Sequence, residues 1–133
     1  MPKGTLEHAN LTVSRPERSA ELLKDLLGWE ERWRGPSLLG GETIHVGLPG
    51  NGADYIAVYT NEDVQKRGDL KHSKGQPLNH VGLVVDDLDG AEKIVLAAGL
   101  ETFSHGDYYP GKRFYFFDWD GIEFEIVSYA ENA

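Results

Sequence analysis

A near-repeat of one short pattern, 72 positions apart, constrains the fold of this chain more than any other feature. Residues 8–13 read HANLTV and residues 80–85 read HVGLVV, so both segments follow the pattern H-x-x-L-x-V. A second pair of similar segments lies later in each half, at residues 27–30 (LGWE) and 98–101 (AGLE). An internal repeat of this kind indicates two similar units that share a core, because neither unit can cover its half-buried sheet alone.

The first unit is expected to run strand, helix, strand, strand, strand. After a strand at residues 6–13, we expect Ser14 to cap a helix, with Pro16 in its first turn and Glu17 completing a capping box. Leucines at helical spacing continue to Gly28, a residue type common just after a helix. The apolar patterns that follow predict three more strands, at residues 29–33, 43–48 and 55–60.

The second unit repeats this order. Asp87 is the expected N-cap of a helix that ends at Gly99. Strands are predicted at residues 80–85, 100–103, 114–117 and 122–127. We therefore predict a single α+β domain over residues 1–133, with a first βαβββ module at about 6–60, a polar linker at 61–79 that is partly helical around Glu62–Arg67, and a second module at about 80–129.

Charge and cysteine content exclude several classes of function. The net charge is -9 and the isoelectric point about 4.9, which argues against nucleic acid or an anionic membrane surface as partner. The absence of cysteine removes disulfides, thiolate nucleophiles and cysteine-ligated zinc. We see no secretory signal and no apolar run of the roughly 20 residues that a membrane helix needs, so a cytoplasmic location is expected.

The stretch from Phe114 to Val127, FYFFDWDGIEFEIV, is predicted to be a hairpin with its turn at the Asp-Gly pair. Glu125 then lies in the middle of the second strand, among large apolar residues. A buried carboxylate is costly unless it is paired or bound to a metal ion. Glu123 is the rival carboxylate, but it lies nearer the turn and is expected to be solvated.

The repeated histidines are the natural companions of Glu125. His8 and His80 occupy the same position in the first strand of each unit, so pseudo-symmetry can bring them together. Two histidines and a carboxylate with open positions form the facial arrangement that binds Fe²⁺, and such sites also take Mn²⁺, Zn²⁺ or Ni²⁺. The simpler alternative is that each histidine is an ordinary hydrogen-bonded strand residue.

The double βαβββ order, the paired H-x-x-L-x-V strands and the ending FYFFDWDG-x-x-x-Glu125 resemble the vicinal oxygen chelate superfamily, which includes glyoxalase I, extradiol dioxygenases, fosfomycin-resistance enzymes and bleomycin-binding proteins. The resemblance implies a curved, barrel-like sheet that lines a cleft with helices outside, and a homodimer. It places the metal ligands on His8, His80 and Glu125. Glyoxalase I and methylmalonyl-CoA epimerase, another member, have a fourth metal ligand, and the corresponding residue here is Ala57. Alanine cannot bind a metal ion, so these two activities are disfavoured.

The resemblance leaves three functions open. We favour a metal-dependent enzyme, most like an extradiol dioxygenase, acting on a small substrate that chelates the ion through two adjacent oxygens. A fosfomycin-resistance-like epoxide-opening enzyme ranks lower, because Lys112 and Arg113 are the only obvious cations near the loop that would hold a phosphonate. The third reading is a metal-free ligand-binding protein, but such members typically lack the histidines that this chain keeps.

Three further side chains are candidates for catalysis. Tyr115 matches the tyrosine of the extradiol dioxygenase signature, although Trp119 stands where that signature usually has proline. The Tyr115 hydroxyl can donate a hydrogen bond to the substrate. His45 lies on the corresponding strand of the first unit and can transfer a proton near neutral pH. Glu42 falls near the place of the glutamate base of the epoxide-opening branch. The simpler alternatives are that Tyr115 is a core residue and that His45 faces solvent.

Aromatic residues that could line a pocket or fill the core are Trp29, Trp33, Tyr55, Tyr59, Tyr108, Tyr109 and Trp119.

Overall fold

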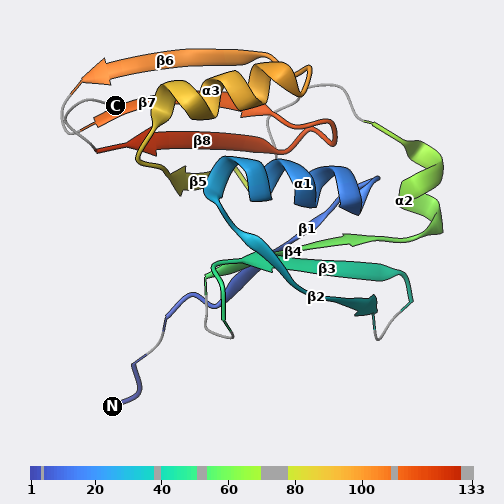
Figure 1. The fold of residues 1–133 in the computed structure, drawn as a ribbon. Helices are drawn as coiled ribbons and strands as arrows, with labels where there is room; N and C mark the ends of the chain where they lie inside the picture. Colours follow the sequence, from blue (N-terminus) through green and yellow to red (C-terminus); the bar gives the residue numbers. More distant parts are fainter. Residues whose placement is uncertain (4, 38–39, 51–53, 70–77, 109–110, 130–133) are drawn as a thin grey trace. The chain divides into compact units, whose positions relative to one another are not determined.

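The computed structural model describes residues 1–3, 5–37, 40–50, 54–69, 78–108 and 111–129, and the side chain of Tyr108 lies outside this description. The chain divides into two compact units, residues 1–68 and 69–133, and each contains one four-stranded sheet (Figure 1). The first unit contains β1 (His8–Thr12), α1 (Pro16–Leu27), β2 (Glu30–Pro36), β3 (Glu42–Gly47), β4 (Tyr55–Thr60) and α2 (Glu62–Arg67). The second contains β5 (Val81–Val84), α3 (Leu88–Ala97), β6 (Thr102–Tyr108), β7 (Gly111–Phe117) and β8 (Glu123–Ser128).

Both sheets have the same topology, which confirms the α+β class and the twofold βαβββ order. The strand order is β1-β4-β3-β2 in the first unit and β5-β8-β7-β6 in the second. In each sheet the first and last strands pair in parallel, and the other pairs are antiparallel. The repeated letters of the sequence therefore mark structurally equivalent strands, β1 and β5.

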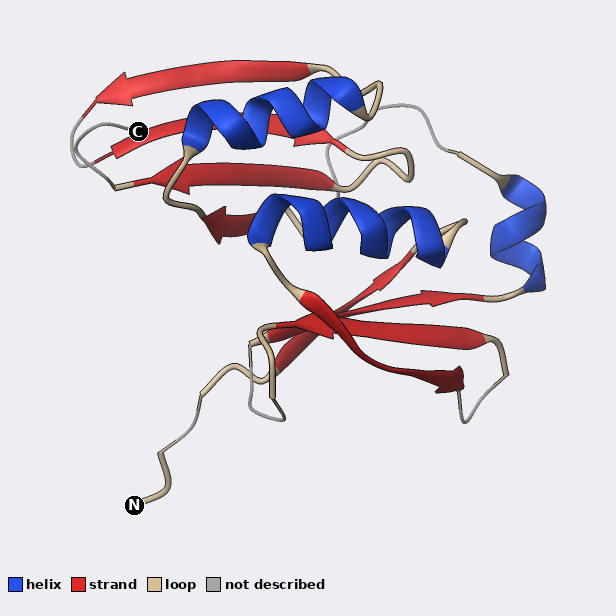
Figure 2. Cartoon of the chain, in the orientation of Figure 1, coloured by secondary structure: helices blue, strands red, loops and turns tan. Residues whose placement is uncertain are grey.

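One long helix covers one face of each sheet (Figure 2). In the first unit α1 packs on β3 and β4. In the second, α3 packs on β6, β7 and β8. The buried apolar side chains follow the alternation of the strands: Leu22, Leu23, Leu26, Ile44, Val46, Ile56 and Val58 in the first unit, and Val95, Phe114, Phe116, Phe124 and Ile126 in the second. The opposite face of each sheet holds polar and aromatic side chains, among them the candidate site residues.

The start of α1 differs from the prediction. The N-cap is Arg15, with no side-chain capping hydrogen bond, and Pro16 occupies the start of the helix. Ser14 is buried and its hydroxyl accepts a hydrogen bond from Arg18, while Glu17 pairs with Arg34 instead of completing a capping box. Pro16 sets this boundary, because its fixed φ suits the first helical position and it has no N–H to be capped.

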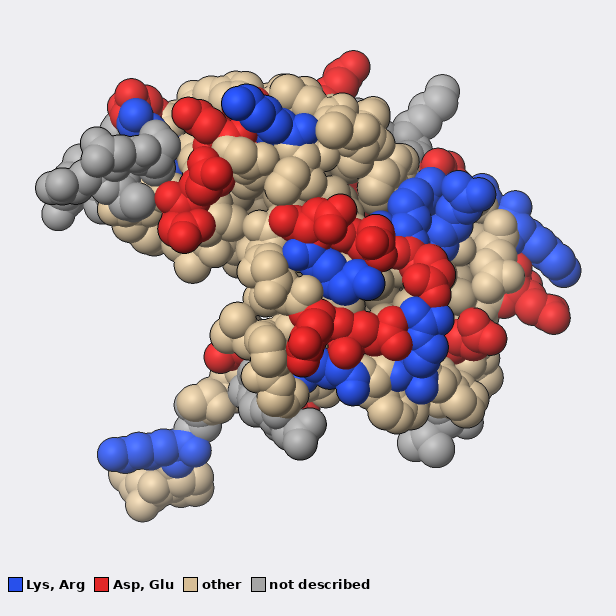
Figure 3. Space-filling view, in the orientation of Figure 1, with Lys and Arg blue, Asp and Glu red and all other residues tan. Residues whose placement is uncertain are grey.

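Most other predicted boundaries agree within two residues, but β2 ends three residues later than predicted, and β6 and β7 extend beyond the predicted 100–103 and 114–117. Asp87 caps α3 by accepting a hydrogen bond from the Gly90 N–H, and Gly28 ends α1 at φ 65°. Within the predicted linker, residues 62–67 are helical as expected (α2), whereas residues 70–77, with His72, lie outside the described residues. Acidic and basic side chains intermingle along α1 in the space-filling view, as expected of a solvated helix face (Figure 3). Over the described parts of the chain, no helix is long and apolar enough to cross a membrane.

Candidate metal centre

His80 and Glu125 converge in the second unit, on the sheet face opposite α3. His80 directly precedes β5, and Gly82 of that strand is in register with Glu125 of β8. Because alternate strand residues point to the same face, both side chains project from one side of the sheet. Nε2 of His80 lies 3.1 Å from Oε1 of Glu125. Two predicted metal ligands thus lie within hydrogen-bonding distance of each other.

The other ring nitrogen of His80 is also engaged. Its Nδ1 lies 2.8 Å from the side-chain oxygen of Asn79. Nε2 faces a carboxylate oxygen of Glu125, a contact that either a hydrogen on Nε2 or a bound cation makes favourable. A partner that fixes the distal nitrogen is typical of metal-binding histidines.

The second oxygen of Glu125 is held by Arg113. Nη1 of Arg113 donates a hydrogen bond of 2.9 Å to Oε2, and the two side chains are only 15% and 14% exposed. Charge-assisted hydrogen bonds of this kind are among the stronger ones in proteins. Each oxygen of Glu125 therefore has its own neighbour, and Oε1 is directed toward His80.

Glu123 and Tyr115 complete this face. The expectation that Glu123 is solvated is wrong: it is 4% exposed, because it pairs with Phe117 inside the hairpin ladder and not in the turn. Its Oε2 lies 4.0 Å from Nδ1 of His80. Tyr115 is in register with Glu125 and its ring stands edge-on to His80, with centroids 5.9 Å apart. The predicted neighbourhood of Tyr115, His80 and Glu125 is thus present within one unit.

In the first unit, His8 belongs to a row of rings on the corresponding face. Its ring stacks on Tyr55 at 4.7 Å, and Tyr55 stacks in turn on His45 at 4.8 Å. Trp33 of β2 follows at 5.1 Å from His45. Nδ1 of His8 lies 2.8 Å from a carboxylate oxygen of Glu7.

Register relates the two faces residue by residue. His45 pairs with Ala57 as Tyr115 pairs with Glu125, so His45 and Tyr115 are equivalent, and Ala57 stands where Glu125 stands. The absence of a carboxylate at Ala57 agrees with a three-ligand centre. Burial, and then the nearby His8 and Arg32, lower the pKa of His45, which favours the neutral imidazole at neutral pH.

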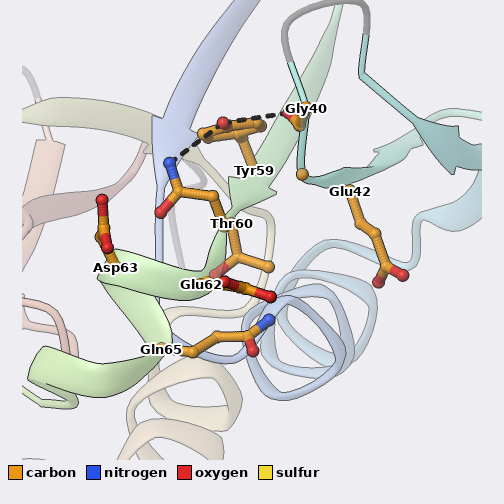
Figure 4. Close-up of a pocket in the computed structure, with 9 residues that line it drawn as sticks. Gly40, Glu42, Tyr59, Thr60, Glu62, Asp63 and Gln65 are labelled. Atoms are coloured by element: carbon orange, nitrogen blue, oxygen red, sulfur yellow. Dashed lines mark hydrogen bonds between the residues drawn. The ribbon is translucent and has the colours of Figure 1, made fainter.

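Glu42 is not brought together with His8 or His45. It is the first residue of β3 and, being even-numbered in that strand, points to the α1 side, whereas His45 points to the other. Along β3 it lies five residues from Gly47, or about 17 Å at 3.3 Å per residue, and Gly47 pairs with Tyr55 beside His8. Glu42 instead lines a cavity of about 570 Å³ at the far end of the sheet, with Tyr59 and Thr60 (Figure 4).

His105 also faces elsewhere. A β-bulge between Phe103 and Gly106 turns His105 toward α3, where its Nε2 binds the carboxylate of Glu92 together with the Thr102 hydroxyl. His105 is therefore not part of the face that carries His80.

Neither unit, over its described residues, holds a group of three or more His, Cys, Asp or Glu side chains that could bind a metal ion by itself. His80 and Glu125 are of a residue type that can bind a divalent cation, and each has a second hydrogen-bonding partner in place.

Sequence reasoning missed two residues of these faces, Asn79 and Arg32, and it did not predict that Arg113 pairs with Glu125. Alternation along β7 could have placed Arg113 on the same side as Tyr115, because the two residues are two positions apart. The pairing of Arg113 with Glu125 depends on the register between β7 and β8, which no sequence pattern predicts. Of the seven aromatic candidates, Tyr109 lies outside the described residues.

Comparisons with known proteins agree with this architecture. A sequence model of the Glyoxalase/Bleomycin resistance protein/Dioxygenase superfamily matches residues 5–126. No curated protein matches the chain.

Solved structures show the same fold at low sequence identity. A glyoxylase/bleomycin resistance protein/dioxygenase domain from Frankia sp. EAN1pec is 24% identical, covers 99% of this chain and 96% of its own, and has a TM-score of 0.76. A mutant of the fosfomycin resistance protein FosX from Listeria monocytogenes, complexed with Mn(II) and 1S,2S-dihydroxypropylphosphonic acid, is 19% identical, with coverages of 94% and 90% and a TM-score of 0.69. FosX from Mesorhizobium loti is 23% identical, with coverages of 95% and 91% and a TM-score of 0.66.

Proposed function

Because the chain belongs to the Glyoxalase/Bleomycin resistance protein/Dioxygenase superfamily, we propose that it is a divalent-metal-dependent enzyme for a small substrate with two adjacent oxygen atoms. One observation carries this proposal. His80 and Glu125 face each other across 3.1 Å with their remaining polar atoms bound to Asn79 and Arg113, so the arrangement is prepared for a cation. A bound ion would supply Lewis acidity to the substrate oxygens.

His8 is the proposed third ligand. It is equivalent to His80 by the repeat and lies at the same end of the equivalent strand. Mn(II) in the FosX structures supports a divalent ion for this fold, and Fe²⁺, Zn²⁺ and Ni²⁺ suit the same ligand types.

The surrounding side chains suggest the reaction. Tyr115 lies beside His80 and would donate a hydrogen bond to a substrate oxygen. His45, as a neutral imidazole, would accept a proton. The rings of Phe103 and Tyr115 stack at 6.0 Å and offer a flat apolar wall. This setting favours a planar substrate, and we propose extradiol-dioxygenase-like opening of a catechol-type ring.

Epoxide opening is the second candidate, since FosX structures share the fold and one holds a dihydroxypropylphosphonic acid. The position of Glu42, at the far end of β3 and on the α1 side, weakens this candidate. His45 would have to replace Glu42 as the base.

The test begins with elemental analysis of protein purified without chelator. We expect about one equivalent of a transition metal, which is lost in His80→Ala and in His8→Ala but retained in His105→Ala, a matched histidine on the α3 side. Oxygen uptake with catechol and loss of fosfomycin with Mn²⁺ then separate the two reactions. A protein without metal that regains none from added divalent ions would contradict the proposal and favour a ligand-binding role.

A further inference from the structure

The cavity of about 570 Å³ in the first unit lies at the end of the sheet where β4 leads into α2 (Figure 4). Its described lining holds three carboxylates, those of Glu42, Glu62 and Asp63, and no lysine or arginine. None of the three forms an ion pair with a described residue. Acidic residues are common in the first turn of a helix and by themselves need no ligand, so the charge alone does not make this cavity a binding site.

Thr60, the last residue of β4, provides evidence that is independent of the charge. It is 1% exposed, and its hydroxyl oxygen has no hydrogen-bond partner among the described residues. The same residue lines the cavity, on the wall that also carries Glu62 and Gln65 (Figure 4). Because a buried polar group without a partner costs free energy, nearly all such groups in folded proteins are hydrogen-bonded. A ligand in the cavity would supply the partner that Thr60 lacks.

Contacts within the first unit hold the walls of the cavity in place. The Tyr59 hydroxyl donates a hydrogen bond of 3.1 Å to the carbonyl oxygen of Gly40 and accepts one of 3.2 Å from the side-chain amide of Asn61. The side-chain oxygen of Asn61 also caps α2. Gly41 has φ 83°, and a Cβ there would lie 2.2 Å from the carbonyl oxygen of Thr60. The cavity is therefore formed before a ligand binds.

A neighbouring cation is already paired. Arg34 lines a smaller cavity of about 350 Å³, which shares Glu42 and Thr60 with the larger one. Glu17 and Glu31 both bind its guanidinium, so Arg34 does not cancel the charge of Glu42. The charge balance of the larger cavity therefore favours a cationic ligand over an anionic one.

We propose that the larger cavity binds a short aliphatic diamine. A primary ammonium group has three N–H donors and no acceptor, which matches in number the acceptors offered by Glu42, Glu62 and Thr60. Glu42 and Thr60 are in register on neighbouring strands, and Asp63 provides a further carboxylate for the second ammonium group. A single metal ion fits less well, because over the described residues no three acidic side chains converge closely enough to hold one. The site uses only residues of the first unit and is separate from the proposed metal ligands.

The test compares three probes of similar length by calorimetry with the full-length protein: diaminobutane with an amine at each end, the same diamine with both nitrogens fully methylated, and the corresponding butanediol. Chelator in the buffer prevents the amines from binding to a metal ion. The methylated probe keeps both charges but has no N–H, and the diol keeps hydrogen bonding but has no charge. We expect diaminobutane to bind at least about tenfold more tightly than either, the difference typical of one charge-assisted hydrogen bond.

Thr60→Val separates binding from folding. Valine has a similar shape and removes only a hydroxyl that has no partner among the described residues, so urea unfolding should show no loss of stability. The affinity for diaminobutane should nevertheless fall about tenfold in Thr60→Val and in Glu42→Gln. Glu30→Gln is the matched control, because Glu30 pairs with Gly47 at one end of the β2–β3 ladder and Pro36 pairs with Glu42 at the other. It makes the same charge change away from the cavity and should keep the affinity.

Three results would overturn the proposal: absence of diaminobutane binding, equal binding of the two dications, or an affinity that survives Thr60→Val or Glu42→Gln. Equal binding of the dications would mean that the net charge of -9 attracts them without a specific site. The comparison of probes on the wild-type protein decides even if a variant fails to fold.

Discussion

Arg113 donates a hydrogen bond of 2.9 Å to Oε2 of Glu125 and leaves Oε1 directed at His80. Removal of the guanidinium would release the carboxylate and leave a largely buried charge without this partner. We therefore expect Arg113→Met to lower the affinity for Mn²⁺ or Zn²⁺ by about 10- to 100-fold, the range typical of residues that support metal ligands. Metal titration of the apoprotein measures this directly.

Lys112→Met provides the control for Arg113. Lys112 is the preceding residue of β7, points to the opposite side, and its side chain is 44% exposed beside Asp107. Its removal takes away the same charge without touching Glu125. An equal loss of metal affinity in both variants would show that net charge, and not the position of Glu125, controls binding.

Glu125 and Glu123 can be separated as candidate ligands. Only Glu125 has an oxygen within hydrogen-bonding distance of Nε2 of His80, whereas Glu123 approaches Nδ1 at 4.0 Å. We expect Glu125→Gln to lose the bound metal and Glu123→Gln to keep it, because glutamine preserves the shape of each side chain but not its charge. Elemental analysis of both proteins decides, and the reverse pattern would reassign the ligand.

Asp118 is expected to stabilise the hairpin that carries Glu125. It is 3% exposed, and its Oδ1 accepts hydrogen bonds of 2.9 Å from the backbone N–H groups of Asp120 and Ile122. Asp118→Ala leaves these buried donors without their acceptor, so we expect a loss of about 1–3 kcal/mol in the free energy of unfolding. Asp118→Asn keeps an acceptor oxygen and should cost less. Urea unfolding measures both, and equal losses would contradict the assigned role.

Local rules predicted most of the fold. The H-x-x-L-x-V repeat identified β1 and β5, and Asp87 caps α3 as its residue type suggests. These features depend on residues close in sequence, and the polar and apolar alternation of strands is likewise local. Ser14 is the exception, because Pro16 shifted the helix start by one residue and left Arg15 as cap.

The surroundings of the candidate site were harder to predict because they depend on register. The partnership of Arg113 with Glu125 exists only because β7 and β8 pair as they do. The bulge at Arg32 reverses the expected alternation of β2, and no single residue type announces it. Its short distance from the turn predicts that Glu123 is solvated, but the strand pairing continues to the pair of Glu123 with Phe117, and Glu123 is buried.

Glu92 should link the stability of the second unit to pH. The Thr102 hydroxyl, and then His105, lower the pKa of Glu92 below its ordinary value of 4.5, against the opposing effect of burial. A carboxylate whose pKa is lower in the folded state stabilises the protein above the unfolded pKa, and that contribution is lost as pH falls through the folded pKa. We expect Glu92→Gln to reduce the free energy of unfolding by about 0.5–1.5 kcal/mol at pH 7, the net value of a hydrogen bond. The difference from the wild-type protein should shrink as the pH is lowered below 4.5. Urea unfolding across this range measures it, and a difference that stays constant with pH would rule out the ionised carboxylate as its source.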